Sequence, residues 1–505
     1  MAPSGASSQD TFHPLYWAER DPDRAAWIFD GTSVSYGQLA AMAVQGCRAL
    51  RARGLRTGDG IVVVAPNHPW SMAVYWAAQL AGLYYTPVSV QFQRDEVRYI
   101  LDDCDAAALV YHPSQLDKVA DAPQRLRIDI EHWPDIIAGE PQTLPADAGE
   151  GAEMLYSSGT TGRPKGVRGA RPGAALGTVS ALFERRVALH RVDRDAVYLS
   201  TAPLYHSAPL RYNAMMHRRG ATSVIMPRFD AADSLALIER HAITHSQWVP
   251  TMFVRLLRLP DAVRERHDLS SHRVAVHAAA PCPPEVKRRM IDWWGPILYE
   301  YYSGTEGNGQ TAIDSAEWLA HPGSVGRPVI GDVHIVGENG DELPRGGTGR
   351  VFFSGGPSFE YYKAPEKTAE AHDHRGWSTL GDIGHLDHDG YLYLTDRASH
   401  MIISGGVNIY PREVEDVLLG HPAVQDAAVF GIPDAEFGEQ VKAAVELVKD
   451  AAGRPAAVSA EALIDFCRSR LAHLKCPRSI DFHAALPRHQ TGKIYKSSLR
   501  EPYLR

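Results

Sequence analysis

The sequence has few cysteines and no long apolar run. Its five cysteines form no C-x-x-C pair, which excludes a disulfide framework and a zinc site built on cysteine pairs: Cys47, Cys104, Cys282, Cys467 and Cys476. No apolar stretch approaches the ~18 residues that a membrane-spanning helix needs, so no integral membrane segment is expected. Residues 1–15 lack the apolar core of a secretory signal. These absences predict a protein of the reducing cytoplasm.

Runs of positive charge are also missing. The formal net charge is −8, and no basic run of five or more residues occurs, which argues against a nucleic-acid partner. A hydrophobic fraction of 44% and a charged fraction of 22% are typical of globular proteins. At 505 residues the chain is too long for one ordinary core, so at least two domains are expected.

The nucleotide-binding loop of the Walker type is absent as well. That loop requires G-x-x-x-x-G-K-[ST]. Lys165 follows a proline and precedes Gly166, and the pair Gly492-Lys493 is followed by Ile494. Neither lysine fits the Walker pattern.

The sequence does contain a run of six small residues at the centre of MLYSSGTTGRPKGV (154–167): Ser157, Ser158, Gly159, Thr160, Thr161 and Gly162. Successive backbone N–H groups in such a loop form a concave anion site, and Lys165 adds a positive charge. A solvated linker is the alternative explanation. The strand-like residues before the run and the stiffening Pro164 favour a cradle for nucleotide phosphates.

Apolar runs and helical patterns alternate through the first 300 residues. Helices are expected at 36–54, 70–83 and 95–104, and strands at 61–65, 84–90 and 107–111, with further alternation over 198–302. This alternation predicts an α/β fold with mostly parallel βαβ sheets. The polar, Pro-rich stretch 113–150 is interpreted as a surface excursion. Loops 157–166, 203–207 and 303–307 follow strands, so they are expected to line one cleft.

The pattern changes beyond Gly326. Residues 330–354 alternate apolar and polar side chains with many glycines, which predicts a small antiparallel or barrel-like subdomain. A helix from Pro411 to Gly420 and further strands and a helix predict a small C-terminal α+β domain. We place the boundary at Asp396, which gives an N-terminal domain of residues 1–395 and a C-terminal domain of residues 396–505.

Five blocks in order give the chain a family resemblance. They are YSSGTTGRPKG (156–166), PLYHS (203–207), YYSGTEG (301–307), LGDIG with YLTDR (380–384 and 393–397), and GGVNIYPREVE with QTGK (405–415 and 490–493). With these blocks the chain resembles the adenylate-forming (ANL) superfamily, and in particular the acyl-CoA synthetases and fatty-acid–CoA ligases. The resemblance implies a large N-terminal domain and a small, mobile C-terminal domain. One departure is Leu380, where many relatives carry threonine.

The resemblance implies a nucleotide site for ATP and AMP. Residues 157–162 and Lys165 would hold the phosphates, Thr305 would contact phosphate, and Glu306 would hold Mg²⁺. The remaining implied contacts are adenine against Ala279, Ala280 and Pro281, base stacking on Tyr302, and the ribose hydroxyls on Asp382 and Arg397.

It also implies how the reaction proceeds. Lys493 would be the catalytic lysine that binds the reacting carboxylate and the α-phosphate, acting together with Thr305 and Glu306. His206 would gate the acyl pocket without acid–base work. Asp396 would be the hinge, and Gly405 and Gly406 would line the CoA channel.

The acyl pocket would be lined by His206, Tyr212, Trp248, Met252, Ser303 and Gly304. The segments around these residues contain no acidic side chain to hold an amino group, and the small Ser303 and Gly304 suggest a deep pocket. An apolar carboxylic acid is therefore expected: fatty, or bulky alicyclic, terpenoid or aromatic. Arg211 either meets a second polar group on the acid or points outward.

The expected activity is an ATP-dependent acid–CoA ligase that uses ATP, Mg²⁺ and CoA. The alternative is an adenylating enzyme that loads the acyl group onto the pantetheine thiol of a carrier protein. A basic patch at the channel mouth, with Arg412 and Lys442 as candidate contributors, would favour free CoA. Joint retention of Lys165, Glu306, Asp382, Arg397 and Lys493 disfavours a non-catalytic relative. A homodimer is compatible with the sequence.

Overall fold

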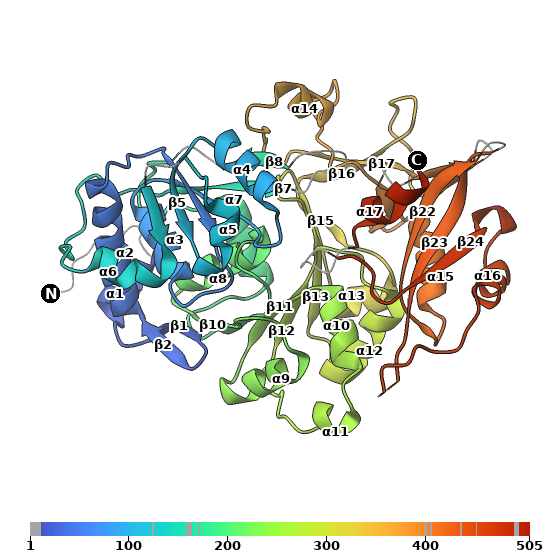
Figure 1. Ribbon diagram of the computed structural model, residues 1–505, viewed down its shortest axis with the longest axis horizontal. Coiled ribbons are helices and arrows are strands. Elements are labelled where there is room, and N and C mark those ends of the chain that lie inside the picture. The colour runs from blue at the N-terminus through green and yellow to red at the C-terminus, as the bar shows by residue number, and fades with distance from the viewer. Residues whose placement is uncertain are drawn as a thin grey trace.

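The computed structural model describes residues 12–504 with gaps at 124–125, 158–163, 170–171, 398–400, 405–406, 435–436, 451 and 489–493. Two large sheets form the N-terminal part, a small antiparallel sheet follows, and a fourth sheet belongs to the C-terminal end (Figure 1). Over these described residues, no helix combines the length and the apolar character needed to span a bilayer.

The first large sheet has six strands in the order β6-β5-β3-β4-β7-β8. All its pairs are parallel except β7 with β8. The bounds are β3 Gly60–Val64, β4 Tyr84–Pro87, β5 Ala106–Tyr111, β6 Leu126–Asp129, β7 Ala152–Ser157 and β8 Lys165–Arg168. Residues Ile61 to Val64 of β3 alternate between the core clusters on the two faces of the sheet, which explains why its sequence is a continuous apolar run.

Helices cover both faces of this sheet: α1 (Pro14–Arg20), α2 (Tyr36–Ala52), α3 (Ser71–Leu80) and α4 (Arg94–Asp103). Helix α2 begins at a capping box, in which the Ser35 hydroxyl accepts from the Gln38 N–H and the Gln38 side chain accepts from the Ser35 N–H. The helices and strands predicted for residues 36–111 are confirmed, with shifts of a few residues at their ends.

The interpretation of residues 113–150 as a surface excursion is wrong. Strand β6 lies within this stretch and pairs in parallel with β5. The stretch also contains the short helices α5 (Leu116–Val119) and α6 (Trp133–Ile137) and 3-10 turns at Pro113–Gln115 and Ile130–His132. Trp133 has no exposed surface. A Cβ added at Gly46 of α2 would lie 2.7 Å from the Trp133 ring, so only glycine lets α2 pack this closely.

The second large sheet has nine strands in the order β15-β14-β13-β12-β11-β9-β10-β1-β2. Its central pairs, from β13 to β1, are parallel, and the outer strands run antiparallel. The bounds are β1 Ala25–Phe29, β2 Thr32–Ser35, β9 Val197–Ser200, β10 Thr222–Ile225, β11 His245–Trp248, β12 Val274–His277, β13 Leu298–Tyr302, β14 Gln310–Asp314 and β15 Arg327–Ile330.

The two faces of this sheet carry different helices. Helices α7 (Ala181–Leu189) and α8 (Ser207–Arg218) contribute to the core cluster on one face, and α9 (Ala231–Arg240), α10 (Pro250–Leu257) and α12 (Pro284–Trp294) to the cluster on the other. Along β13, Tyr299 and Tyr301 join the α8 face, whereas Leu298 joins the α12 face. Successive residues of this strand therefore serve opposite sides of the sheet.

The predicted antiparallel subdomain is a four-stranded sheet in the order β16-β17-β18-β19, with all pairs antiparallel. Its strands are β16 Asp332–Val336, β17 Gly349–Ser354, β18 Asp382–Leu386 and β19 Leu392–Arg397. The other helices before the C-terminal elements are α11 (Asp261–Arg264), α13 (Ser315–Ala320) and α14 (Pro365–Glu370). The predicted boundary at Asp396 falls inside β19, and it stays a prediction.

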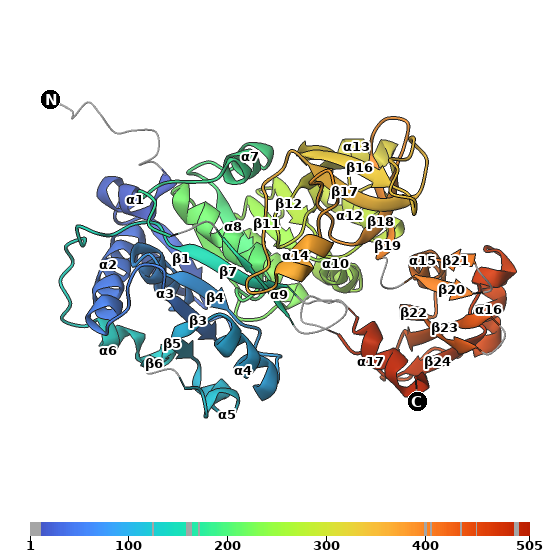
Figure 2. The same ribbon diagram turned by 90° about the horizontal axis from the view of Figure 1, so that it is seen from above.

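The C-terminal elements gather at one end of the molecule (Figure 2). Their sheet runs β21-β20-β23-β22, with β24 parallel to β23, and α15 (Pro411–Leu419), α16 (Ala460–Arg468) and α17 (Lys496–Arg500) pack beside it. The strands are β20 Ile402–Ser404, β21 Val407–Ile409, β22 Val424–Asp434, β23 Gly438–Leu447 and β24 Ser479–His483. The turns His473–Lys475 and Glu501–Tyr503 are 3-10 helices. The Arg258 guanidinium after α10 donates to the Gln425 carbonyl at 3.3 Å, which links the two parts.

Candidate functional site

The predicted phosphate loop runs from the end of β7 to the start of β8. Its residues Ser158, Gly159, Thr160, Thr161 and Gly162 lie outside the described residues, as does the side chain of Ser157. The backbone of Ser157 pairs with that of Lys165 across the loop. The Lys165 ammonium lies 4.7 Å from the centroid of the Tyr361 ring, a cation–π distance.

Tyr361 connects this lysine to the third predicted loop. Its hydroxyl donates to Glu306 Oε1 at 2.8 Å, and its backbone bridges to Val167 of β8. The cation of the first loop and the carboxylate of the loop 303–307 therefore meet around one buried ring. Sequence reasoning missed Tyr361, because the surrounding residues SFEYYKAP match no motif.

These two charged groups have the chemistry that a metal-bound triphosphate needs. The Glu306 carboxylate is a hard oxygen ligand of the kind Mg²⁺ prefers, and the Lys165 ammonium suits phosphate oxygens. Gly304 is packed closely, because an added Cβ would lie 2.7 Å from Glu306 Oε2 and 2.8 Å from the Leu380 side chain. Glycine at 304 thus lets the carboxylate approach, whereas the sequence suggested that it deepens a pocket. Thr305 is half-buried between these two residues.

The residue predicted to stack on the base, Tyr302, contacts Asp382, one of the two residues predicted to bind the ribose. The Tyr302 hydroxyl donates to Asp382 Oδ2 at 2.6 Å, and the Tyr302 ring packs against Phe353 with centroids 6.0 Å apart. Asp382 opens β18 directly across from Arg397 of β19. The side chains of Asp396 and Arg397 lie outside the described part. The register nevertheless sets the two predicted ribose residues opposite each other.

The predicted adenine segment follows β12. Ala279 is exposed and has φ +76°, a left-handed conformation that is rare for residues other than glycine. Ala280 is half-buried and Pro281 is exposed. Strained backbone is frequently found at functional sites, which is compatible with a segment that contacts a ligand.

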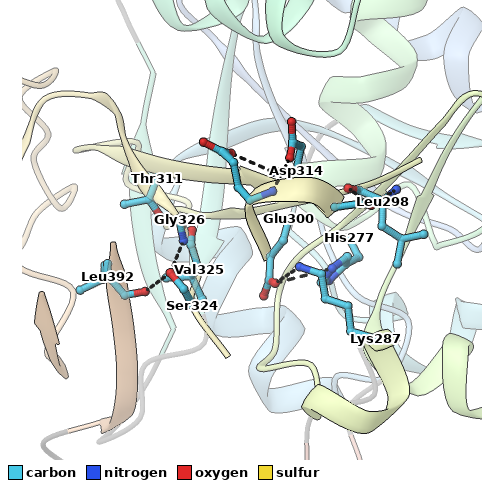
Figure 3. A network of polar contacts seen from close by, with 12 residues as sticks. His277, Lys287, Leu298, Glu300, Thr311, Asp314, Ser324, Val325, Gly326 and Leu392 are labelled. Atoms are coloured by element: carbon cyan, nitrogen blue, oxygen red, sulfur yellow. Dashed lines mark hydrogen bonds and ion pairs between the residues drawn. The ribbon is translucent and has the colours of Figure 1, made fainter. Parts of the chain in front are cut away.

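A buried polar network joins the end of β12, before that segment, to helix α12, after it (Figure 3). Lys287 of α12 contacts Glu300 Oε2 of β13 at 2.6 Å, and His277 Nε2 at the end of β12 lies 3.6 Å from the same oxygen. Lys287 has no exposed surface. Burial raises the pKa of Glu300 and lowers that of His277. The ion pair attaches α12, the helix that follows the adenine segment, to β13 of the sheet.

The predicted acyl residues do not all lie together. Tyr212 of α8 stacks between Tyr198 and Tyr301, with centroids 6.0 and 6.5 Å away. Trp248 lies on the opposite face of the sheet, where it packs against Trp294 and its indole N–H donates to Ser246 Oγ at 2.6 Å. The structure therefore does not bring Trp248 to Tyr212.

Three further acyl candidates, Met252, Ser303 and His206, each contact a neighbouring residue. The Thr201 hydroxyl approaches Met252 Sδ at 3.3 Å, and the Ser303 hydroxyl donates to the Gly309 carbonyl at 2.8 Å. His206 precedes α8 and packs edge-on against Tyr205 with centroids 4.7 Å apart. Their roles stay predictions.

Three cations considered in the sequence have acidic partners. Arg211 donates to Glu153 Oε2 at 2.6 Å, so it is paired within the chain and does not simply point outward. The Lys442 ammonium is buried and contacts Asp481 at 2.8 Å, so its assignment to a basic patch for CoA phosphates is wrong. Arg412 contacts Asp416 at 2.6 Å.

Sequence reasoning also missed a polar cluster beside Tyr301. Gln247 of β11 accepts from the Tyr198 hydroxyl at 3.3 Å, and the Arg186 side chain of α7 donates to Gln310 Oε1 at 3.1 Å. Single amides and arginines carry no motif, so only strand register could have located them. Lys493, Gly405 and Gly406 lie outside the described residues, and their predicted roles rest on the sequence.

Comparisons with known proteins agree with this geometry. The family model described as AMP-binding enzyme matches residues 15–362, and that of the AMP-binding enzyme C-terminal domain matches residues 413–493. A feruloyl-CoA synthase of Amycolatopsis sp is 33% identical over 497 residues, which cover 97% of this chain and 98% of that protein. The long-chain-fatty-acid–CoA ligase FadD13 of Mycobacterium tuberculosis is 31% identical over 499 residues, which cover 95% and 96% of the two chains.

Solved structures show the same likeness. The crystal structure of ATP-bound MatB from Rhodopseudomonas palustris matches with a TM-score of 0.86 at 28% identity, covering 98% of this chain and 99% of that one. The chain therefore belongs to the AMP-binding enzyme family, within the adenylate-forming superfamily, and it is an enzyme of the acyl-CoA synthetase type.

Proposed function

We propose that the chain is an AMP-forming acid–CoA ligase for apolar carboxylic acids: fatty, or bulky alicyclic, terpenoid or aromatic. The acid is first joined to the α-phosphorus of ATP, and pyrophosphate leaves. The thiol of CoA then attacks the acyl carbon of the adenylate, and AMP leaves. The observation that carries this proposal is the meeting of Lys165 and Glu306 around Tyr361, with Tyr302 and Asp382 bonded nearby.

The residues of the first step act mainly by charge. Both reactants are anions, so they must be held together against their repulsion. Lys165 offsets phosphate charge, and Glu306 would hold Mg²⁺, which supplies further positive charge against the phosphates. Asp382 accepts hydrogen bonds from the ribose hydroxyls. Lys493 binds the acid carboxylate and the α-phosphate, and its ammonium offsets the charge that grows in the transition state.

The second step uses a different part of the C-terminal domain. Gly405 and Gly406 would admit the pantetheine arm, because backbone without side chains allows a ligand to approach closely. Lys493 and this glycine pair belong to one small domain behind Asp396. A rotation at Asp396 would bring first one and then the other to the acid.

The acceptor thiol is the point on which the alternative differs. Relatives named as CoA synthases and CoA ligases support free CoA. The buried ion pair of Lys442 removes one of the two cations expected to bind CoA phosphates. A carrier-protein pantetheine therefore stays the second candidate.

The deciding experiment measures AMP and pyrophosphate release with ATP, Mg²⁺ and CoA. The acids are short, medium and long fatty acids, benzoates, cinnamates and polycyclic terpenoid acids. We expect CoA-dependent AMP release with one of these classes. Acid-dependent release of pyrophosphate without CoA-dependent release of AMP would support the carrier protein. If neither AMP nor pyrophosphate is released with any acid, the proposal is contradicted. A homodimer is a separate proposal, which light scattering tests.

A further inference from the structure

Gln310, the first residue of β14, has a buried amide with one unsatisfied side. Its side chain is 1% exposed, and its Oε1 accepts from Arg186 Nε at 3.1 Å. A guanidinium has only donors, so the amide oxygen must face Arg186 and the NH₂ group must point elsewhere. Within the residues that the structure describes, Nε2 has no hydrogen-bond partner.

This orphaned donor is costly to the folded chain. Leaving a buried donor unpaired is unfavourable, and the great majority of buried polar groups in proteins have a partner. An unpartnered buried polar atom calls for an explanation, and a ligand that completes it is one such explanation. The missing partner of Gln310 must be a hydrogen-bond acceptor.

The position of Gln310 connects it to the acid site. In the antiparallel pair of β13 and β14, Tyr302 lies opposite Thr311. Continued one step beyond the end of β13, this register sets Gln310 opposite Ser303, whose hydroxyl donates to the neighbouring Gly309 carbonyl. Ser303 belongs to the segment proposed to line the acyl pocket. The orphaned amide is therefore at the acid's end of β13.

The hydroxyl groups of two tyrosines near Gln310 already have partners within the chain. The Tyr198 hydroxyl is bonded to Gln247, and the Tyr212 hydroxyl lies 3.1 Å from His190 Nδ1. Their rings and that of Tyr301 form an aromatic layer with neighbouring planes 24° and 21° apart. An apolar body suits this layer.

The local charge is positive. The Arg186 guanidinium lies 5.6 Å from the Tyr301 ring centroid and is half-buried, and its polar contact among the described residues is with the neutral Gln310. Arg211, on the other side, is paired with Glu153. Two donor groups with one uncompensated positive charge suit an oxygen that only accepts, namely a carbonyl or a carboxylate.

We propose that Gln310 and Arg186 bind a second oxygen acceptor of the substrate, a carbonyl or carboxylate distal to the carboxylate that reacts. The substrate is then an apolar acid that carries one such group. This inference rests on the proposed ligase function and narrows its substrate class. Arg186 contacts the acceptor directly or orients the amide, and Gln310 supplies the buried donor.

The test compares matched pairs of acids that differ only in the distal group. Suitable pairs are cinnamate with 4-carboxycinnamate, octanoate with 7-oxooctanoate, and cyclohexanecarboxylate with 4-oxocyclohexanecarboxylate. In at least one pair, kcat/KM for CoA-dependent AMP release should be about tenfold or more higher for the oxygenated acid, because a site built to bond an oxygen discriminates strongly against an analogue that lacks it.

Variants assign this preference to the two residues. Gln310→Leu and Arg186→Met should each reduce the ratio of kcat/KM within the pair to about twofold or less. Gln310→Glu should reverse the preference for a carboxylate, because two carboxylates repel. Arg185→Met is the matched control: its guanidinium donates to the Val329 carbonyl at 3.2 Å, and the preference should persist. Thermal unfolding of each variant checks that it folds.

The outcomes separate the two proposals. AMP release with no preference in any pair, or a preference that survives both Gln310→Leu and Arg186→Met, overturns this inference and leaves the ligase proposal standing. The absence of AMP and pyrophosphate release from every acid of both kinds overturns the ligase proposal and this inference together.

Discussion

The Tyr302 hydroxyl donates a hydrogen bond of 2.6 Å to Asp382. This bond joins the end of β13 in the nine-stranded sheet to the start of β18 in the antiparallel sheet. A residue proposed to stack on the base thereby orients the carboxylate proposed to hold the ribose. A carboxylate accepts several bonds at once, so Asp382 can keep this contact and still bind hydroxyls.

Removing that hydroxyl should weaken nucleotide binding. Tyr302→Phe keeps the ring and loses a hydrogen bond to a charged group, which contributes about 1.5–3 kcal/mol. This energy bounds the effect, so the dissociation constant of AMP should rise by no more than roughly 10- to 150-fold. Titration calorimetry with AMP measures this change. Tyr299→Phe, on the same strand and the opposite face, is the control and should bind AMP normally. Equal affinity of Tyr302→Phe and the unaltered chain would contradict the assignment.

The bond from Tyr361 to Glu306 predicts a change in metal dependence. Tyr361→Phe frees the proposed Mg²⁺ ligand to turn, so half-maximal pyrophosphate release should need several-fold more Mg²⁺. Glu306→Gln removes the charged ligand and should lower the rate further, because Mg²⁺ prefers carboxylate oxygen. The measurement is a Mg²⁺ titration at saturating ATP. An unchanged titration curve for Tyr361→Phe would show that the bond does not orient Glu306.

The pair of Lys287 and Glu300 predicts strong non-additivity in stability. Lys287→Met leaves a buried carboxylate without its partner, which should lower the free energy of unfolding by about 3–5 kcal/mol. The double variant Lys287→Met/Glu300→Leu replaces the ion pair with an apolar pair and should recover most of that loss. Urea unfolding measures both. A double variant that is less stable than either single variant would contradict this account.

Buried histidines predict that stability falls in acid. Burial lowers the pKa of His190, His217 and His272 from 6.5 to about 3. Between pH 6.5 and about 3 the unfolded chain binds protons at these sites and the folded chain does not, so the free energy of unfolding decreases as pH falls through this range. The slope reaches about 1.4 kcal/mol per pH unit for each such histidine.

Urea unfolding at about pH 7.5 and about pH 5.5 tests this pH dependence. His272→Phe should have a shallower dependence, and the exposed His388→Ala should keep the original one. The raised pKa of Glu300 acts in the opposite direction, because the folded chain binds that proton more readily. A free energy of unfolding that is the same at both pH values would refute the prediction.

The proposed domain rotation predicts two separable half-reactions. Lys493→Ala should abolish adenylate formation from acid and ATP, yet retain thioester formation from a supplied acyl-adenylate. Asp396→Pro should stiffen the hinge, so that pyrophosphate is released once and overall turnover is lost. Equal loss of both half-reactions in Lys493→Ala would argue against two poses. Wild-type turnover in Asp396→Pro would argue against a hinge at this position.

Elements with a long or uniformly apolar pattern could be predicted from the sequence. Helix α2 has 17 residues, enough to show a helical period, and the short strand β3 is a continuous apolar run; both are confirmed. Residues 113–150 form elements of three to five residues, too short to show a period, so Trp133 could not be assigned to the core. Its burial depends on Gly46, which is far away in the sequence.

The site divides in the same way. Glu306, Tyr302 and Asp382 belong to motifs; the structure bonds Tyr302 to Asp382, and it bonds Glu306 to Tyr361, whose ring Lys165 contacts. Tyr361, Arg186 and Gln310 belong to none. Their positions follow from strand pairing and from contacts across more than a hundred residues, as with Arg186 and Gln310, which are 124 positions apart. A linear pattern does not contain that information.

The alternation along β13 has a consequence for how such an enzyme can change. Tyr301 faces the aromatic layer, and Tyr302 bonds to Asp382. Neighbouring residues of one strand are thus proposed to serve two different ligands, and the pleat keeps their side chains apart. Substitutions on the Tyr301 side can shift the choice of acid while the nucleotide contacts persist. A descendant could acquire a new substrate through a few changes on that side and retain its source of chemical energy.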